Sequence, residues 1–522
     1  MARRRIGCGH RVQFGQRSRC IRCRAGAAVV KRRAIRSEPL FFERNSRRVR
    51  RQGYLLPVLD VPEVTPSEVL PPELIRKPDP HFPDISEMEV VQHFHRLSQL
   101  NYAVDEGLYP LGSCTMKYNP RINEEIARLP GFASLHPLQP QSQIQGALRL
   151  IWELEESLKA ITGMPGATLQ PAAGAHGELT GILMIRKALE ARGEKREIVL
   201  VPDSAHGTNP ATATFAGYRA QEIPSADDGT VDLGALDRMM DDTVAALMLT
   251  VPNTLGIFEH QILEIADLVH SRGGFIYMDG ANLNSFVGRA LPGLMGADAM
   301  HINLHKTFST PHGGGGPGAG PVTVSEALLP HLPVPKVQRD DNGFELLWKD
   351  PASIGQMRGF YGNFLILVRA LTYIWSLGAE GLRSMSDVAV LYANLVRHRL
   401  NGAYHLKFDA PSLHEVVFDD SIQTRHEVHN VDIAKRLLDY GFHPPTMSFP
   451  LIVHGALMIE PAESVAPDEI EAFCDAMLAI AEEAESDPGL VRSAPHDTPV
   501  GRVDEVRAAR NLKVTWTPDD EG

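Results

Sequence analysis

Cysteine is scarce in this sequence, and long apolar runs are missing. Five cysteines in 522 residues are too few for a disulfide scaffold, so we expect a reducing compartment, the cytoplasm. Because no run of about 18 apolar residues is present, we expect no membrane span. The longest candidate for a signal-peptide core, residues 25–30, is short and is followed by three basic residues, which argues against a signal peptide.

Acidic residues are absent from residues 1–36, where basic residues are concentrated. Residues 1–51 hold 17 of the 52 lysines and arginines but only 2 of the 64 acidic residues, which leaves a net charge of −27 on the remainder. An acidic body argues against a nucleic-acid surface. The charge pattern therefore separates a basic N-terminal extension from the rest of the chain.

We predict that this extension, residues 1–38, is disordered. Cys8, His10, Cys20 and Cys23 could bind zinc, but their spacing is irregular and no hydrophobic knuckle follows, so we predict no metal site. A transit peptide or sequence translated upstream of the true start would have the same composition.

The length exceeds one compact core, so we expect at least two domains. Residues 39–125 combine a proline-rich extended arm with a loop rich in functional side chains; such arms commonly lie across a partner subunit, and a tethered linker is the alternative. Residues 126–330 form the expected large domain, and residues 331–522 a smaller α+β domain and tail.

Strands and helices alternate in the large domain. Short apolar runs predict strands at 196–202, 244–251, 274–278 and 297–304. Helical spacing is shown by two apolar sets: Leu179, Ile182, Leu183 and Leu189, then Ile262, Ile265, Ala266 and Val269. This alternation predicts the α/β class, with a mostly parallel sheet that binds ligands at the carboxyl ends of its strands.

The smaller domain is expected to begin after Pro321, where the pattern changes. We predict a long helix over about 363–402, short strands near 415–418 and 450–454, and a helix over 467–484.

Lys306 and Asp279 are the strongest candidates for chemistry. Each follows an apolar run that we predict to be a strand, so both are expected at one edge of the sheet. A lysine amine can form a Schiff base with pyridoxal phosphate, and an aspartate can keep the pyridine nitrogen protonated. A solvated surface lysine and a helix N-cap are the alternative interpretations.

A turn of small residues, Gly174-Ala175-His176, precedes a predicted helix. Free backbone N–H groups at such a helix start can bind a phosphate, although many helix starts have this composition. His176 is placed where an imidazole could lie flat on a pyridine ring; a partly buried structural histidine is the alternative. Ala281 would then contact the opposite ring face.

Two loops complete the candidate pocket. His206 follows the strand at 196–202 and could orient the cofactor or a substrate carboxylate, or simply cap the loop. The loop 109–120 contains Cys114, for which we find no base partner, so we interpret it as a packing or redox-sensitive thiol.

These segments resemble the glycine decarboxylase P-protein of the glycine cleavage system. The specific matches are Leu-Gly-Ser-Cys-Thr-Met-Lys-Tyr-Asn-Pro at 111–120 and His-Lys-Thr-Phe at 305–308; others lie at 170–178, 203–210, 279–284 and 432–447. The resemblance spans about residues 39–495. It departs at Ala462, where threonine is expected, and in carrying residues 1–36. The length resembles the second, lysine-bearing subunit of the two-subunit prokaryotic form.

The resemblance implies a fold-type I pyridoxal phosphate enzyme with a Schiff base on Lys306. It adds Asn282 and His305 to the cofactor-binding residues. Glycine would displace Lys306, lose carbon dioxide, and pass its aminomethyl group to the lipoyl disulfide of the H-protein, the activity of glycine dehydrogenase (aminomethyl-transferring). Expected partners are P-protein subunit 1 and the lipoylated H-protein, with the T- and L-proteins in the same system.

Two other interpretations remain. An aminotransferase or a serine hydroxymethyltransferase would share Lys306 and Asp279 but would need an arginine for the substrate carboxylate and would lack the 112–120 loop. A non-catalytic companion subunit would not be expected to keep Lys306.

Overall fold

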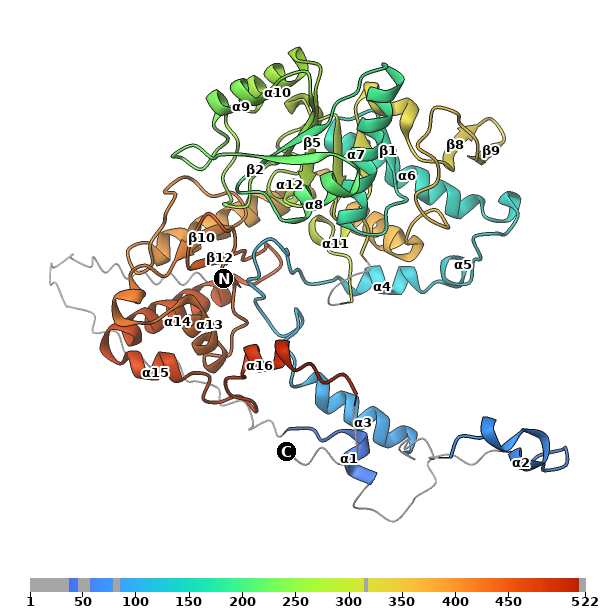
Figure 1. The fold of residues 1–522 in the computed structure, drawn as a ribbon, viewed down its shortest axis with the longest axis vertical. Coiled ribbons are helices and arrows are strands. Elements are labelled where there is room, and N and C mark those ends of the chain that lie inside the picture. The colour runs from blue at the N-terminus through green and yellow to red at the C-terminus, as the bar shows by residue number, and fades with distance from the viewer. Residues whose placement is uncertain (1–36, 46–56, 78–84, 314–317, 516–522) are drawn as a thin grey trace, which may run out of the picture.

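The computed structural model describes residues 37–45, 57–77, 85–313 and 318–515. The predicted disordered extension and its candidate zinc ligands therefore lie almost entirely outside the described residues. Figure 1 shows a large sheet domain, a smaller C-terminal domain beside it, and an N-terminal arm that reaches away from both.

A seven-stranded sheet forms the centre of the large domain, in the order β1-β7-β6-β5-β4-β2-β3. Strands β2 to β6 run parallel, and β7 runs antiparallel to both β6 and β1. The strands are β1 Gly166–Thr168, β2 Ile198–Pro202, β3 Arg219–Ile223, β4 Val244–Thr250, β5 Phe275–Gly280, β6 Ala299–Ile302 and β7 Val322–Val324. The α/β class and the mostly parallel sheet are confirmed.

The central strands are apolar along their whole length because both sheet faces are covered. Leu247 and Leu249 of β4 join a core with α6, α10 and α12, whereas Ala246 and Met248 join a second core with α7. Alternation of side chains along a strand produces this division. The helices are α6 Gln145–Thr162, α7 Gly174–Ala191, α8 Thr208–Phe215, α9 Leu233–Met239, α10 Ile262–Ser271 and α11 Leu304–Thr307.

The smaller domain contains a three-stranded antiparallel sheet in the order β10-β12-β11. Its strands and helices are β10 Val416–Asp419, β11 Thr446–Met447, β12 Ala456–Ile459, α13 Asn430–Asp439, α14 Pro467–Ser486, α15 Pro488–Ser493 and α16 Glu505–Arg510. Leu108, far upstream, is buried in the core of this domain. The loop that follows Leu108 is therefore anchored on the smaller domain.

The remaining elements lie before the sheet or connect the domains. They are α1 Phe41–Asn45, α2 Pro66–Val69, α3 Glu87–Ser98, α4 Arg121–Ala127 and α5 Pro130–Ala133, with the hairpin β8 Lys336–Asp340 and β9 Gly343–Leu347. Short 3-10 helices cover η1 Pro72–Leu74, η2 Gln141–Gln143, η3 Leu283–Ser285, η4 Pro292–Met295, η5 Glu326–His331 and η6 Gln423–His426.

Helix α12, Phe364–Leu400, connects the two domains and is kinked at Gly378. Leu367, Leu371 and Ile374 pack in the large core, whereas Val396 and Leu400 pack in the core of the smaller domain. By length and composition α12 is the one described helix that could cross a membrane. Charged residues such as Arg369 interrupt α12, so it contains no unbroken apolar run of the length expected for a membrane span. Its packing in both cores accounts for its apolar composition.

Some of the predicted elements were wrong. Lys306 does not end a strand: β6 stops at Ile302, and Lys306 lies on the one-turn helix α11. The predicted position of Asp279 at the end of a strand is confirmed, since it is the second-last residue of β5. The strand predicted near residues 450–454 is a turn, in which Leu451 is 86% exposed to solvent.

Several strands and helices were missed, among them the strands β1, β3 and β7 and the helices α3, α6 and α13. Strand β3 is a largely exposed edge strand, and β1 and β7 have three residues each, so none has a recognisable apolar run. The arm is not extended throughout, because α3 occupies twelve residues of it. The start of α3 could have been predicted from the sequence, because Ser86 and Glu89 have the spacing of a capping box and form one.

Candidate active site

Asp279 lies on the buried strand β5, and both of its carboxylate oxygens have hydrogen-bond donors. Its Oδ1 accepts a hydrogen bond from the Ala281 N–H at 2.9 Å, and its Oδ2 accepts one from Asn209 Nδ2 at 3.1 Å. The Nε2 atom of His301 lies 3.5 Å from Oδ1. Burial alone would raise the pKa of Asp279, but the charges of His301 and Lys306 and these hydrogen bonds outweigh it and lower that pKa. The site therefore contains a fixed, buried negative charge.

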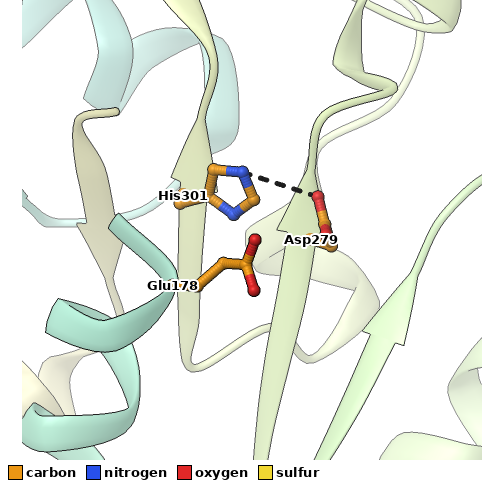
Figure 2. A group of neighbouring side chains, drawn as sticks. All are labelled: Glu178, Asp279 and His301. Atoms are coloured by element: carbon orange, nitrogen blue, oxygen red, sulfur yellow. Dashed lines mark ion pairs between the residues drawn. The ribbon is translucent and has the colours of Figure 1, made fainter. Parts of the chain in front are cut away.

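His301 contacts Asp279 from the neighbouring strand β6, and Glu178 lies close to both. Figure 2 shows the Glu178 carboxylate, from α7, beside the His301 ring, which points at Asp279 from the neighbouring strand β6. The other ring nitrogen of His301 pairs with the Tyr277 hydroxyl. Glu178 accepts hydrogen bonds from Thr208, Asn209 and Thr212. Because these donors already satisfy Glu178, we assign no metal to this group.

Lys306 lies half-buried at the same edge of the sheet. Strand β5 pairs with β6, which places Asp279 beside His301, and α11 begins directly after β6. The Lys306 amine donates to the Ser113 carbonyl at 2.8 Å. The positive charge of Lys306 is among the causes that lower the pKa of Asp279, so the two groups are within electrostatic reach. The predicted pairing of Lys306 and Asp279 at one sheet edge therefore agrees with the structure.

The N-terminus of α7 contacts the residues just before Lys306. Its N-cap residue is Ala173, and no side-chain cap is formed there within the described residues. A Cβ atom at Gly174 would lie 2.5 Å from Asn303 Oδ1, so a larger residue here would force the Asn303 side chain to shift. Nearby, the buried side-chain oxygens of Asn303, Thr307 and Thr310 have no hydrogen-bond partner within the described chain. An uncapped helix start and unused hydroxyls are the donors that a phosphate group requires.

His176 lies in the first turn of α7, next to the exposed Ala175. Its Nδ1 accepts the Ala172 N–H at 3.1 Å. Burial, and then the charge of Arg358, lower the pKa of His176, so the ring is neutral near pH 7. A neutral ring held by one nitrogen suits stacking on a flat ligand.

The other predicted site residues differ in their burial and in their hydrogen-bond partners. Asn282 donates from Nδ2 to the Pro252 carbonyl at 2.9 Å, and its buried Oδ1 has no described partner. Burial lowers the pKa of His305 to about 3, and its Nδ1 also lacks a described partner. His206 is exposed, pairs with Thr208 at 2.9 Å, and lies with its ring 5.5 Å from that of Phe449. His206 therefore belongs to the rim of the site.

The loop 109–120 covers Lys306 and joins it to the smaller domain. The Ser113 N–H donates to Glu415 at 2.9 Å, and the Thr115 N–H donates to Glu460 at 3.1 Å. The buried Lys117 amine donates to the Thr307 carbonyl at 3.0 Å and pairs with Glu463 at 2.5 Å. Cys114 is an exposed free thiol.

Sequence families match along most of the chain. Residues 56–343 match the family described as glycine cleavage system P-protein, and residues 385–493 match the C-terminal domain of glycine dehydrogenase. The chain belongs to the P-protein family of the glycine cleavage system.

Three relatives carry the name probable glycine dehydrogenase (decarboxylating) subunit 2. The protein of Chloroherpeton thalassium is 52% identical over 93% of this chain and 99% of its own length. That of Caldanaerobacter subterraneus is 53% identical over 90% and 96%, and that of Pyrococcus horikoshii 53% over 93% and 97%. The chain is thus subunit 2 of this decarboxylating glycine dehydrogenase, an enzyme of pyridoxal phosphate-dependent glycine decarboxylation.

Solved structures show the fold-type I architecture. A glycine decarboxylase (P-protein) of the glycine cleavage system in inhibitor-bound form superposes with a TM-score of 0.65 at 21% identity, covering 80% of this chain and 93% of that one. A glutamate decarboxylase of Lactobacillus brevis gives 0.60 at 15% identity, covering 81% and 97%. At these identities the likeness establishes the fold alone.

Sequence reasoning missed several polar residues that this P-protein chain gathers around Lys306. His301 and Asn209 lay inside segments already singled out, and the partner of a buried aspartate was the signal to look for. Lys117 was in the loop but had no assigned role. Glu415 and Glu460 lie more than 100 residues further along the chain, and no spacing rule connects them to Lys306.

Proposed function

We propose that Lys306 carries pyridoxal phosphate and that glycine loses its carboxylate there. The observation that supports this most directly is the placement of the Lys306 amine and the buried Asp279 charge at one sheet edge, beside an uncapped helix start. When bound, the cofactor supplies an electron-accepting ring for the electrons of the broken bond.

Each residue of the site has a role in this proposal. Asp279, fixed by His301 and Asn209, holds a proton on the ring nitrogen. The Gly174–Ala175 helix start, with the unused Thr307 and Thr310 hydroxyls, binds the phosphate. His176 and Ala281 would contact the ring of the cofactor, and Asn282, His305 and His206 would line the site. The Ser113 carbonyl accepts a hydrogen bond from the Lys306 amine and would hold that amine whenever it is not bonded to the cofactor.

The partners follow from the family. As subunit 2, the chain works with a subunit 1 within the glycine cleavage system. We infer further that the aminomethyl group passes to the lipoyl arm of the H-protein, that the T- and L-proteins process the product, and that the reaction takes place in the prokaryotic cytoplasm.

Carboxyl exchange tests this function. The chain is co-expressed with subunit 1, and exchange of the glycine carboxyl carbon with labelled bicarbonate is measured with and without lipoylated H-protein. We expect exchange that requires both proteins and is abolished by Lys306→Ala. Exchange that persists in Lys306→Ala, or its absence from the complete mixture, would overturn the proposal.

A further inference from the structure

A second group of buried ionisable side chains lies next to Lys306. His414, Glu415 and Glu460 have exposed fractions of 0%, 0% and 1%. One nitrogen or oxygen atom from each lies within 4.8 Å of the others. Glu415 directly precedes β10 and Glu460 directly follows β12, and the antiparallel pairing of these strands brings the two carboxylates together.

The hydrogen bonds of this group are incomplete. Glu415 accepts the Ser113 N–H at its Oε2, and Glu460 accepts the Thr115 N–H and Asn284 Nδ2. The Oε1 of Glu415 and both ring nitrogens of His414 are buried without a partner in the described chain, with His414 Nε2 at 3.5 Å from that oxygen. A buried acid with an unused oxygen is free to carry a proton.

Lys306 is the cationic group that faces these carboxylates. Ser113 connects the two, since its N–H donates to Glu415 and its carbonyl accepts the Lys306 amine. The charge of Lys306 shifts the pKa values of Glu415, Glu460 and His414. The pKa of the Cys114 thiol is in turn affected by the charges of Lys306, Glu415 and Glu460. The charge of the pair is therefore linked to the charge of the lysine.

Two neighbouring buried carboxylates cannot both ionise at little cost. Burial, with a contribution from the Glu460 charge, raises the pKa of Glu415 well above its ordinary value, and burial raises that of Glu460 to about 7. Burial lowers the pKa of His414 to about 3, so its ring is neutral. Near neutral pH the pair holds at least one proton and can gain or lose another.

We propose that Glu415 and Glu460 form a proton-exchange pair for the Lys306 nitrogen. The Lys306 ammonium must lose one proton before its nitrogen can attack the cofactor aldehyde, and the pair accepts it. As the C–N bond forms, a second proton passes from nitrogen to the aldehyde oxygen. The pair then returns its proton to that oxygen, the C–O bond breaks and water leaves, so the pair ends in its starting state.

This inference rests on the proposed attachment of the cofactor to Lys306. It is tested by adding pyridoxal phosphate to the cofactor-free complex with subunit 1 and following the visible absorption band between pH 5.5 and 9. In the unmodified complex we expect the loading rate to rise with pH through a limb near pH 7. Glu415→Gln and Glu460→Gln should each load about 100-fold more slowly at pH 7 and lose or displace that limb.

Glu259→Gln is the matched control. Glu259 is buried, accepts the Val231 N–H at 2.9 Å and has a pKa raised by burial, but Lys306 is not among the groups that shift it. We expect it to load at the unmodified rate. Thermal unfolding verifies that each variant is folded. If Glu415→Gln does not fold, Glu415→Asp, which keeps a carboxylic acid, takes its place and should show part of the unmodified loading rate.

The outcomes separate the two proposals. Loading of both glutamine variants at the unmodified rate, or slowing by the same factor at every pH with the limb unchanged, would overturn the proton-exchange role. An unmodified complex without a limb near pH 7 would overturn it equally. Absence of a borohydride-reducible link at Lys306 in the unmodified complex would instead overturn the proposed function.

Discussion

Asp279 shows how a buried carboxylate stays charged. An isolated aspartate in this position would bind a proton, because burial penalises its ionised form. Asn209, the Ala281 N–H and His301 supply the compensating interactions, and each comes from a different segment of the chain. The negative charge therefore depends on the assembled sheet edge and not on Asp279 alone.

Replacing Asp279 with asparagine removes the charge and keeps the shape. We expect Asp279→Asn to retain bound cofactor but to lower glycine–bicarbonate exchange by at least about 100-fold, because the ring nitrogen loses its charged partner. Cofactor absorption measured on the same sample separates binding from chemistry. Asp241→Asn, an exposed carboxylate, should exchange at the unmodified rate; equal loss in both variants would contradict this role.

Glu460 gives a pH dependence with a defined sign. Its pKa in the folded protein is raised to about 7, so the stabilisation of its neutral form is complete below pH 4.5 and is lost as the pH rises through about 7. A glutamine side chain at this position would be neutral at every pH. The unfolding temperature of Glu460→Gln, relative to the unmodified chain, should therefore increase from pH 5 to pH 8, and a constant difference would argue against the raised pKa.

Among the elements, α7 and the strand β6 pack so closely that a glycine is required between them. A Cβ atom at Gly177 would lie 2.5 Å from the Gly320 carbonyl oxygen and 2.9 Å from His301 Cβ. Neither neighbour is the flexible end of a side chain. The contact positions the helix start against the residues that precede Lys306.

Gly177→Ala should therefore destabilise the fold by about 1–3 kcal/mol and weaken cofactor binding, because α7 must move away from β6. Urea unfolding and cofactor titration measure the two effects. Gly146→Ala is the control: it lies in α6 with open space around its Cβ position and should be neutral or slightly stabilising. Comparable losses in the two variants would contradict the close-packing argument.

The loop 109–120 is fixed by a buried ion pair. Lys117→Met would leave Glu463 buried and without its cation, at a cost of about 3–5 kcal/mol in unfolding free energy. The Thr307 carbonyl would also lose its donor, so Lys306 should be held less firmly. Denaturant unfolding measures the cost, and Arg149→Ala, which breaks an exposed pair with Glu153, should change it little. A Lys117→Met chain as stable as the unmodified one would contradict this.

Most of the elements that the sequence predicted have long, regular patterns, although the 18-residue helix α6 was missed. The strands β2, β4 and β5 and the helices α7, α10, α12 and α14 were found within a few residues, because each is continuously apolar or strongly periodic. Edge strands such as β3, and the three-residue strands β1 and β7, were missed because pairing rather than composition makes them strands. The small helix that carries Lys306 was read as the end of β6 for the same reason.

The candidate site was predictable only where motifs are local. Lys306, Asp279 and the 174–176 turn could be named from neighbouring residues, and the structure brings them together. Glu415, Glu460 and Lys117 acquire their roles through tertiary contacts across the two domains, which no local pattern records. The roles of all these residues, and those of His176, Ala281, Asn282, His206 and His305, stay predictions.

At the scale of the whole molecule, the site is shared between two domains and covered by a loop anchored on the smaller one. The N-terminal arm exposes a series of large apolar residues, including Val58 at 96%, Val69 at 66% and Leu74 at 69%. A free monomer would leave this apolar surface in water. We expect the arm to lie across another subunit, in agreement with a chain that works as half of a pair.

Trapping the cofactor with borohydride identifies the lysine that carries it. The complex with subunit 1 is loaded with pyridoxal phosphate, reduced, digested and sequenced by mass spectrometry. We predict a single pyridoxyl-modified lysine in this chain, Lys306, and none in a Lys306→Ala complex, whose visible band should also be absent. Modification of the neighbouring buried Lys117, or a visible band that survives Lys306→Ala, would contradict the account.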